Sequence, residues 1–173
     1  MKNIFLIGMP SSGKTSLGKL LAKQLLYQFI DLDAKIVEEE GASIAHIFKE
    51  KGEAYFRQVE SKVLHQLKPN NSLVVATGGG TPCFFDNMAF IQENGLSIFL
   101  DVSPTELLRR MMSSKKNERP LFDTQDESHT LLLALELKYS ERLSFYNQAK
   151  YRIQDDDIEI EMLLQVLNNG VLK

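Results

Sequence analysis

Cysteine is almost absent from this chain, in which Cys83 is the only one among 173 residues. A single cysteine excludes an intrachain disulfide and a cysteine-rich zinc site, and it favours a reducing compartment. We interpret Cys83 as a small buried hydrophobic residue rather than as a reactive thiol.

An excess of charge is also absent, because 20 Lys and Arg residues stand against 23 Asp and Glu residues, a net charge of -3. Non-specific binding to DNA or RNA depends on neutralising phosphates, so we expect no nucleic-acid partner. The first apolar run, Ile4–Ile7, is too short for a signal-peptide core or a membrane span. We therefore expect a cytoplasmic protein with no membrane partner.

Internal repeats, low-complexity tracts and Pro/Gly/Ser-rich linkers are missing as well, so we expect one domain over residues 1–173. Short apolar segments alternate with segments of helical period, which predicts an α/β fold with a mostly parallel sheet covered by helices. The predicted strands are Ile4–Ile7, Phe29–Asp31, Leu73–Thr77, Ser97–Leu100 and Tyr151–Ile153.

Two helices have recognisable patterns. In the first, the spacing of Leu17, Leu20, Leu21 and Leu25 predicts one apolar face against the sheet. The second begins at Ser103-Pro104-Thr105-Glu106, where serine is the predicted N-cap and glutamate completes a capping box. The polar stretch that follows, residues 113–128, is long for a connection, so it is either a functional segment such as a lid or disordered.

The segment Gly8-Met9-Pro10-Ser11-Ser12-Gly13-Lys14-Thr15 matches the phosphate-binding pattern Gly-x4-Gly-Lys-Thr between a predicted strand and a predicted helix. Two glycines permit a tight turn whose N–H groups point at phosphates, the lysine reaches the β- and γ-phosphates, and the threonine hydroxyl binds Mg²⁺. The predicted nucleotide-binding residues here are Gly8, Ser11, Ser12, Gly13, Lys14, Thr15 and Ser16. Kinases, GTPases and ATPases share this loop, so it leaves the phosphate acceptor open.

Asp31 and Asp33 close the second predicted strand, at the sheet edge where the phosphate loop also lies. One carboxylate could help to hold Mg²⁺ through water, and the other could accept a proton from an attacking hydroxyl. A pair of capping or solvated aspartates accounts for the same residues equally well.

Three consecutive glycines, Gly78, Gly79 and Gly80, follow the third predicted strand. They carry a cost in chain entropy that close approach of the backbone to a ligand would explain, and a flexible turn is the alternative. Arg57 and Arg142, each taken alone, fit a solvated or glutamate-paired arginine. Converging on one cleft, they would suit a substrate carboxylate, because the guanidinium fork binds that group bidentately.

Taken together, these residues resemble the shikimate kinases, small kinases of aromatic amino-acid biosynthesis. The resemblance runs nearly end to end and rests on Gly8 to Thr15, Asp31-Leu32-Asp33, Ser43 to Phe48, Gly52-Glu53 through Phe56-Arg57 and Glu60, Gly78-Gly79-Gly80, and Arg119-Pro120-Leu121. It implies a P-loop kinase fold with a five-stranded parallel sheet of order 2-3-1-4-5 and helices on both faces. It also implies a substrate-binding helical region at about 33–62 and a mobile lid at about 113–126.

The activity implied by the resemblance is ATP-dependent phosphorylation of the 3-hydroxyl of shikimate, with ATP as co-substrate and Mg²⁺ as metal, in a protein that we expect to be a monomer. Lys14 and Thr15 would then serve the phosphates and the metal, and Asp31 would support the metal through water. Asp33 would orient and deprotonate the attacking hydroxyl.

The remaining implied roles concern the substrate and the lid. Arg57 and Arg142 would clamp the shikimate carboxylate, and the backbone of the three glycines would line the same pocket. Arg119 would either balance charge on the transferring phosphoryl group or be one more charge in a solvated loop, and Arg110 would lie near the adenine.

Two features depart from the family pattern. Ala76 stands where the family often has serine, which would remove a hydroxyl near the water shell of the metal. The segment Asp155–Asp157 is unlike the adenine-side loop of the family, and we interpret its acids as starting the last helix. Two other functions stay open on this fold: a kinase of another small polyol or sugar acid such as gluconate, and a catalytically weak nucleotide-binding regulator.

Overall fold

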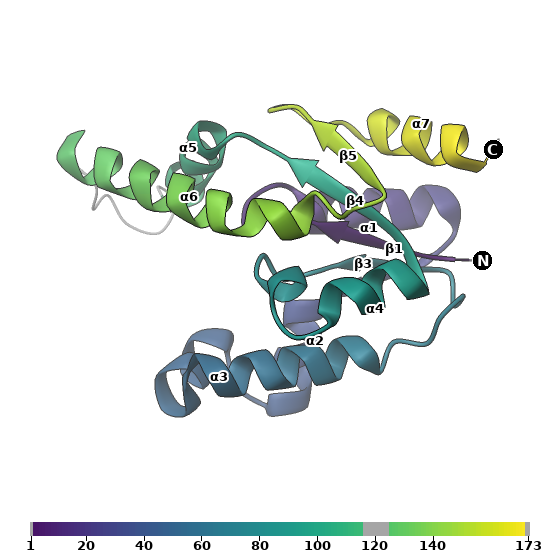
Figure 1. The fold of residues 1–173 in the computed structure, drawn as a ribbon, viewed down its shortest axis with the longest axis horizontal. Coiled ribbons are helices and arrows are strands. Elements are labelled where there is room, and N and C mark those ends of the chain that lie inside the picture. Colours follow the sequence, from purple (N-terminus) through teal and green to yellow (C-terminus); the bar gives the residue numbers. More distant parts are fainter. Residues whose placement is uncertain (1, 116–124, 172–173) are drawn as a thin grey trace.

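Five strands alternate with helices in the computed structural model, which describes residues 2–115 and 125–171 (Figure 1). The elements, in chain order, are β1 (Asn3–Ile7), α1 (Lys14–Leu25), β2 (Gln28–Asp31), α2 (Leu32–Glu40), α3 (Ile44–His65), β3 (Leu73–Ala76), the short 3-10 helix η1 (Thr81–Cys83), α4 (Asn87–Asn94), β4 (Gly95–Asp101), α5 (Pro104–Lys115), α6 (Gln125–Tyr146), β5 (Tyr151–Gln154) and α7 (Ile160–Val171).

The five strands form one parallel sheet in the order β2-β3-β1-β4-β5. In the register at its centre, Phe5 pairs with Val75 on one side and with Ser97 on the other. β1 is buried at every position, as expected for a central strand covered on both faces. The α/β class, the five strands and the strand order expected from the sequence are confirmed.

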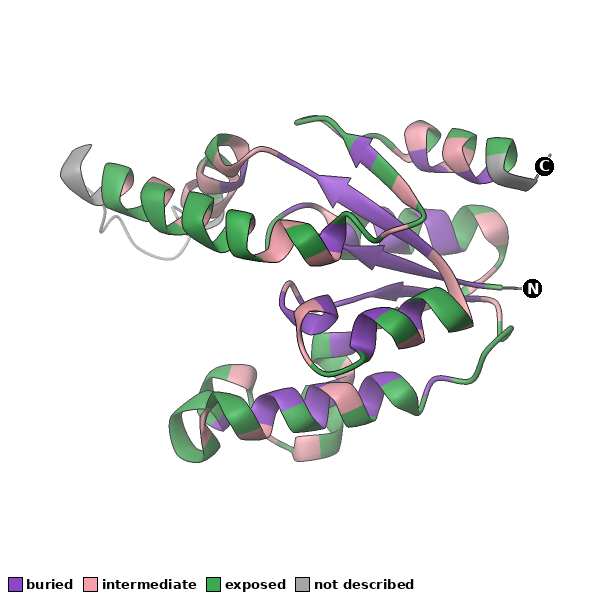
Figure 2. Ribbon diagram, viewed as in Figure 1, coloured by how far each residue is buried: buried purple, intermediate pink, exposed green. Residues whose placement is uncertain are grey.

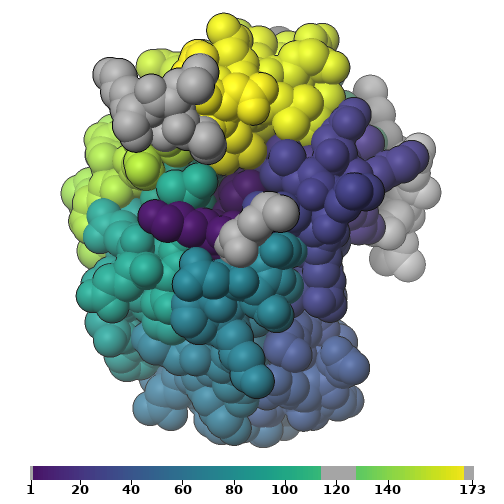
Figure 3. All heavy atoms as spheres, turned by 90° about the vertical axis from the view of Figure 1, so that its right-hand side faces the viewer, coloured from purple at the N-terminus to yellow at the C-terminus, as the bar shows by residue number. Residues whose placement is uncertain are grey.

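Helices cover both faces of the sheet, and in Figure 2 the central strands are mostly purple, the colour of buried residues, whereas β5 at the edge is partly exposed. The crossovers from β1 to β2 and from β3 to β4 run in opposite directions across the sheet, so right-handed connections place α1 and α4 on opposite faces. α7 packs beside α1, and α6 packs against α5 and η1. A view from the side with the termini shows α7 and α3 at opposite ends of the molecule (Figure 3).

The buried face of α1 differs from the predicted one. Leu17 and Leu21 are buried and Leu25 packs on the core, but Leu20 is 50% exposed. The buried face is centred on Gly18, which closely approaches the sheet, and Leu20 falls on the other side of the helix. The prediction for Leu20 was wrong because it was based on the spacing of leucines alone and did not include a glycine in the buried face.

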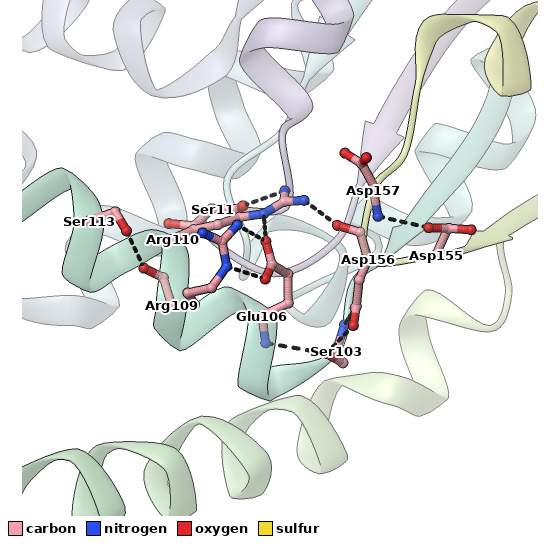
Figure 4. A network of polar contacts seen from close by, with 9 residues as sticks. All are labelled: Ser11, Ser103, Glu106, Arg109, Arg110, Ser113, Asp155, Asp156 and Asp157. Atoms are coloured by element: carbon pink, nitrogen blue, oxygen red, sulfur yellow. Dashed lines mark hydrogen bonds and ion pairs between the residues drawn. The ribbon is translucent and has the colours of Figure 1, made fainter. Parts of the chain in front are cut away.

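The start of α5 also differs in one detail (Figure 4). Ser103 is the N-cap as predicted, since its Oγ accepts a hydrogen bond from the Glu106 N–H at 3.3 Å. Glu106 does not complete a capping box: it pairs with Arg109 and Arg110, and Asp156 accepts from the Ser103 N–H at 2.8 Å in its place.

That contact also corrects the interpretation of the acidic segment Asp155–Asp157. α7 begins only at Ile160 and has Glu161 as its first-turn acid, so the three aspartates do not start the last helix. They form a turn after β5 in which the Asp157 N–H donates to Asp155 Oδ1 at 2.7 Å. Asp156 is thereby available to cap α5.

The helical region expected at about 33–62 coincides with α2 and most of α3, which is interrupted at Gly52. Most of the expected lid at 113–126, with Arg119, lies outside the described residues. Within the described part of the chain, no helix is both long enough and apolar enough to span a bilayer.

Candidate active site

The phosphate loop connects β1 to α1 and depends on its two glycines. Gly8 and Gly13 have φ values of 142° and 96°, which side-chain-bearing residues rarely adopt. Gly8 also leaves no room, because a Cβ there would lie 2.7 Å from the Leu100 carbonyl oxygen. Gly13 is the N-cap of α1, so the positive end of that helix faces the loop.

A cleft of about 470 Å³ opens over this loop at the carboxyl edge of the sheet. It brings together predicted residues from the loop, from β2 and α2, and from α5, and its lining is Pro10, Ser11, Gly13, Lys14, Thr15, Ser16, Asp31, Asp33, Thr77 and Arg110. Gly8 and Ser12 are buried behind this surface. Ligands of open α/β sheets bind at this edge, next to the strand where the chain direction across the sheet reverses.

Lys14 is buried at the base of the cleft, with 8% of its surface exposed. Its Nζ donates to the carbonyl oxygens of Gly8 and Met9, at 2.9 Å and 2.7 Å. Burial lowers the pKa of Lys14 to about 8, against the opposing attraction of Asp33, and the positive charge of Arg142 adds to the lowering. The protonated amine is therefore a poorly hydrated positive charge at the position where a phosphate group would bind.

Asp31 uses its two carboxylate oxygens for different tasks. Oδ1 accepts from the Ala34 N–H at 3.2 Å and caps α2, while Oδ2 accepts from the Thr15 hydroxyl at 2.8 Å. Among the described residues no group of three or more His, Cys, Asp or Glu could hold a metal alone. This pair of oxygens fits Mg²⁺, which keeps several waters and takes one or two protein ligands beside phosphate oxygens.

Asp33, in the first turn of α2, lies near a second carboxylate. A Cβ on Gly78 would be 2.9 Å from Asp33 Oδ1 and 2.7 Å from Glu60 Oε1, so the two carboxylates flank the same glycine. Loss of hydration raises the pKa of Asp33, and the negative charges of Glu60 and Asp31 raise it further. Asp33 has a stronger affinity for a proton than an ordinary aspartate.

The next two glycines lie close to the phosphate loop and to two arginines. A Cβ on Gly79 would lie 2.7 Å from Pro10 and 3.0 Å from Arg142 Nη1, and one on Gly80 would lie 2.7 Å from both terminal nitrogens of Arg57. None of Gly78, Gly79 and Gly80 has a positive φ. Close approach of protein side chains therefore suffices to explain these glycines, whose backbone we had expected to approach a ligand.

Arg57 is buried rather than solvated, with 8% of its surface exposed. It forms ion pairs with Glu60 at 2.7 Å and Glu53 at 3.1 Å, and its guanidinium carbon lies 4.2 Å from the Phe84 ring centroid. Arg142 arrives from α6, and its neighbour one turn later, Tyr146, donates its hydroxyl to the Gly79 carbonyl at 2.5 Å. The two arginines thus meet at adjacent glycines from different helices.

Arg110 bridges the phosphate loop and the acidic turn (Figure 4). Its guanidinium donates to the Ser11 carbonyl at 3.3 Å, to the Asp156 carbonyl at 2.6 Å and to Glu106 Oε1 at 2.7 Å. Arg119 lies outside the described residues, so the structure leaves its predicted role as it stood.

Three further residues of this region were not among the predicted site residues, although Ala76 and Glu60 entered the comparison with the family pattern. Thr77 lines the cleft, and its hydroxyl donates to the Leu6 carbonyl at 3.0 Å. Ala76, before it, is buried in β3 opposite Asp31. Glu60 could have been found from its position three residues after Arg57, a spacing at which helix side chains meet.

Comparisons with known proteins agree with this geometry. Residues 10–169 match the family model described as shikimate kinase. A shikimate kinase of Phocaeicola vulgatus is 40% identical over 173 residues, which is 100% of this chain and 98% of that protein. One of Bacteroides thetaiotaomicron is 38% identical over 159 residues, or 92% of this chain and 90% of that protein.

Two solved structures are similar throughout. The crystal structure of shikimate kinase from Bacteroides thetaiotaomicron has a TM-score of 0.85 and 38% identity, and 99% of each chain is covered. Shikimate kinase from Acinetobacter baumannii in complex with shikimate has a TM-score of 0.80 and 32% identity, covering 99% of this chain and 93% of that one.

Proposed function

The chain belongs to the shikimate kinase family, and from this premise we propose that it transfers the γ-phosphoryl group of ATP to the 3-hydroxyl of shikimate, giving shikimate 3-phosphate and ADP. The observation that carries the choice of acceptor is the meeting of Arg57 and Arg142 at Gly79 and Gly80, beside the phosphate loop. Two guanidinium groups at one place suit a small substrate with a carboxylate.

The phosphate loop and Lys14 hold the triphosphate. In the free protein the Lys14 amine is bonded to loop carbonyl oxygens, and it exchanges these partners for β- and γ-phosphate oxygens. Thr15 and Asp31 would hold Mg²⁺, and their hydrogen-bonded oxygens, 2.8 Å apart, support this assignment. The metal would supply positive charge that offsets the negative charge developing during transfer.

Asp33 acts as the general base. Its carboxylate lies in the cleft between the phosphate loop and Gly78, where it can accept a hydrogen bond from the attacking hydroxyl. Its raised pKa supports this role, because a base works best when its pKa approaches the working pH. Arg119 would neutralise charge on the transferring group, and Arg110 would lie against the nucleotide.

The test is a coupled ADP-release assay with purified protein, ATP, Mg²⁺ and shikimate. We expect turnover that requires shikimate and stops when EDTA removes the metal. Release of ADP no faster than the ATP-only background would overturn the proposal. The same assay with gluconate and other sugar acids distinguishes the alternative kinases, and tight binding of shikimate without turnover would indicate a regulator.

We further propose that the enzyme is a cytoplasmic monomer with a substrate-binding helical region at about 33–62 and a lid at about 113–126. Light scattering on the eluting protein should then give a mass near 19.7 kDa with and without ligands. A mass of twice that value would exclude the monomer.

A further inference from the structure

Behind Arg57 lies a closed set of hydrogen bonds that joins α3, η1 and α4. The Thr81 hydroxyl donates to Glu60 Oε1 at 2.6 Å, and Asn87 Nδ2 donates to the Thr81 carbonyl at 2.9 Å. Ser61 Oγ donates to Asn87 Oδ1 at 2.7 Å, and Ser61 follows Glu60 in α3, which closes the circuit. We call Glu60, Ser61, Thr81 and Asn87 the Asn87 ring.

The ring is sealed from water at three of its four positions, since Glu60, Thr81 and Asn87 are each 0% exposed. A buried carboxylate is tolerated only when its oxygens have partners. Glu60 divides its two: Oε1 takes the Thr81 hydroxyl, and Oε2 takes Arg57 Nη1 at 2.7 Å. The Thr81 hydroxyl thus determines which oxygen is left for the arginine.

Ring members also hold the surfaces that enclose the guanidinium. Thr81 directly follows Gly80, against which both terminal nitrogens of Arg57 lie. Phe84 follows η1 and stacks on the guanidinium at 4.2 Å. Because Asn87 and Thr81 fasten η1 to α3, they fix Gly80 and Phe84 relative to the helix that carries Arg57.

This arrangement leaves a defined part of Arg57 for a ligand. A guanidinium has five N–H donors. Glu53 takes the Nε donor and one on Nη2, and Glu60 takes one on Nη1. Among the described residues this leaves one N–H on each terminal nitrogen to donate to a ligand carboxylate.

We propose that Thr81 and Asn87 are positioning residues for substrate binding: through Glu60 and η1 they hold Arg57 so that its two remaining N–H groups point together at the substrate carboxylate. The inference rests on the proposed function, since it is the shikimate carboxylate that this fork binds. Neither residue lines the nucleotide cleft, so their effect is confined to the acceptor side.

Removing the Thr81 hydroxyl should misplace the guanidinium group of Arg57 while Arg57 itself stays in the site. In Thr81→Val a buried Glu60 oxygen loses its only donor from η1, and the carboxylate turns to take a second N–H from Arg57. One of the two Arg57 N–H groups left for the substrate is then hydrogen-bonded to Glu60 and cannot bind the substrate carboxylate. We expect the KM for shikimate to rise at least about tenfold, the scale of one charge-assisted hydrogen bond, with the KM for ATP within twofold of the parent.

The matched control is Thr81→Ser, which keeps the hydroxyl and should keep the KM for shikimate within about 1.5-fold. Ser61→Ala opens the ring at its least buried position and should raise the same KM at least about twofold, because η1 loses part of its fastening. Calorimetric titration of shikimate into each protein with ADP present measures the affinity independently of turnover. Circular dichroism and thermal melting establish that each variant is folded.

The outcomes separate the possibilities. A folded Thr81→Val protein with a lower melting temperature and an unchanged KM for shikimate would make the ring purely structural and overturn the inference. If that variant does not fold, Ser61→Ala decides, and an unchanged KM there has the same meaning. Failure of the parent protein to phosphorylate shikimate would instead refute the proposed function, and the inference with it.

Discussion

At the scale of single residues, the acceptor side contains more carboxylates than cations can fully balance. Asp33 and Glu60 flank Gly78. The negative charges of Glu60 and Asp31 both act on Asp33, while Lys14 and Arg57 only partly offset them. Burial and this crowding together raise the pKa of Asp33, which suits the general-base role proposed for it. Charge crowding at Asp33 is therefore suited to catalysis rather than to stability.

Replacing Asp33 by asparagine tests the assignment of the base. We expect Asp33→Asn to lower kcat at least about 100-fold, the usual contribution of a general base, with little change in the KM for ATP. The control is Asp157→Asn, which removes one negative charge outside the cleft and should leave kcat within twofold. An unchanged kcat with a raised KM for shikimate would mean that Asp33 only binds the substrate.

Replacing Arg57 by alanine tests the carboxylate clamp. We expect the KM for shikimate to rise about 10- to 100-fold, since a charge-assisted bond is removed, whereas the KM for ATP stays close to that of the parent. Arg109→Ala is a suitable control, because the Arg109 side chain hydrogen-bonds to Glu106 on the exposed side of α5 and does not line the cleft. Equal effects of the two substitutions on shikimate would contradict the clamp.

The lowered pKa of Lys14 predicts a basic limb in the activity profile. The amine is charged below its pKa of about 8 and loses its proton as pH rises through that value, well before an ordinary lysine at 10.5. We expect kcat/KM for ATP, which reports the free enzyme, to fall above about pH 8. Burial raises the pKa of Cys83 to about 11, so this thiol does not titrate there. A flat profile to pH 9.5 (roughly one and a half units higher) would contradict the prediction.

At the scale of elements, the strands could be predicted and the helix contacts could not. The central strands β1, β3 and β4 are mostly apolar and buried, so their positions are visible locally, and the partly exposed edge strands β2 and β5 each contain apolar or aromatic residues. The cap of α5 depends on Asp156, which lies 53 residues away from Ser103 and is brought to it only by the β4–β5 pairing. The local sequence pattern predicts that Glu106 accepts the hydrogen bond from the Ser103 N–H, whereas in the structure Asp156 accepts it.

The Asp156 contact gives a prediction about nucleotide binding. Its carboxylate holds Ser103, and its carbonyl holds Arg110 over the phosphate loop. We expect Asp156→Ala to raise the KM for ATP about fivefold, in line with the loss of a cap worth about 1 kcal/mol, and to leave the KM for shikimate unchanged. Asp156→Asn, which keeps an acceptor oxygen, should restore most of the affinity. A uniform rise in both KM values would point to general loosening instead.

From the sequence, the carboxylates and arginines of the site could be named as candidate residues, but their contacts with one another could not be predicted. Arg57 and Arg142 each suited a solvated surface position, and only the packing of α3 and α6 against the glycine segment brings them together. The family resemblance supplied their roles before the structure supplied their positions. Nothing in the sequence indicated that Asn87 would lie behind the clamp.

At the scale of the whole molecule, one hydrophobic core runs from Ile4 in β1 to Leu167 in α7. The cleft proposed to bind the substrates lies at the carboxyl edge of the sheet inside this core, so ligand binding there should stabilise the molecule as a unit. The sheet order was predictable because the resemblance fixed the family, whereas spacing alone predicted only an α/β class.

Ligand-induced stabilisation can be measured by thermal unfolding. ADP at a hundred times its Kd should raise the free energy of unfolding by about 2.7 kcal/mol, which for this size is an increase in Tm of about 5–10 °C. Because there is one core, we expect a single transition in both states. Two transitions, of which only one responds to ADP, would show that the helical region unfolds separately.

The three glycines after β3 have a consequence for inheritance. Each contacts a different functional group: the carboxylates at Gly78, the phosphate loop at Gly79 and the clamp at Gly80. A first- or second-base change in a glycine codon introduces a side chain or a stop codon, and a Cβ at each of these three positions would lie 2.7 Å from its nearest neighbouring atom. In a saturation library selected for growth that depends on this enzyme, these three codons should tolerate third-base changes alone, so that the DNA would vary there while the protein stays fixed.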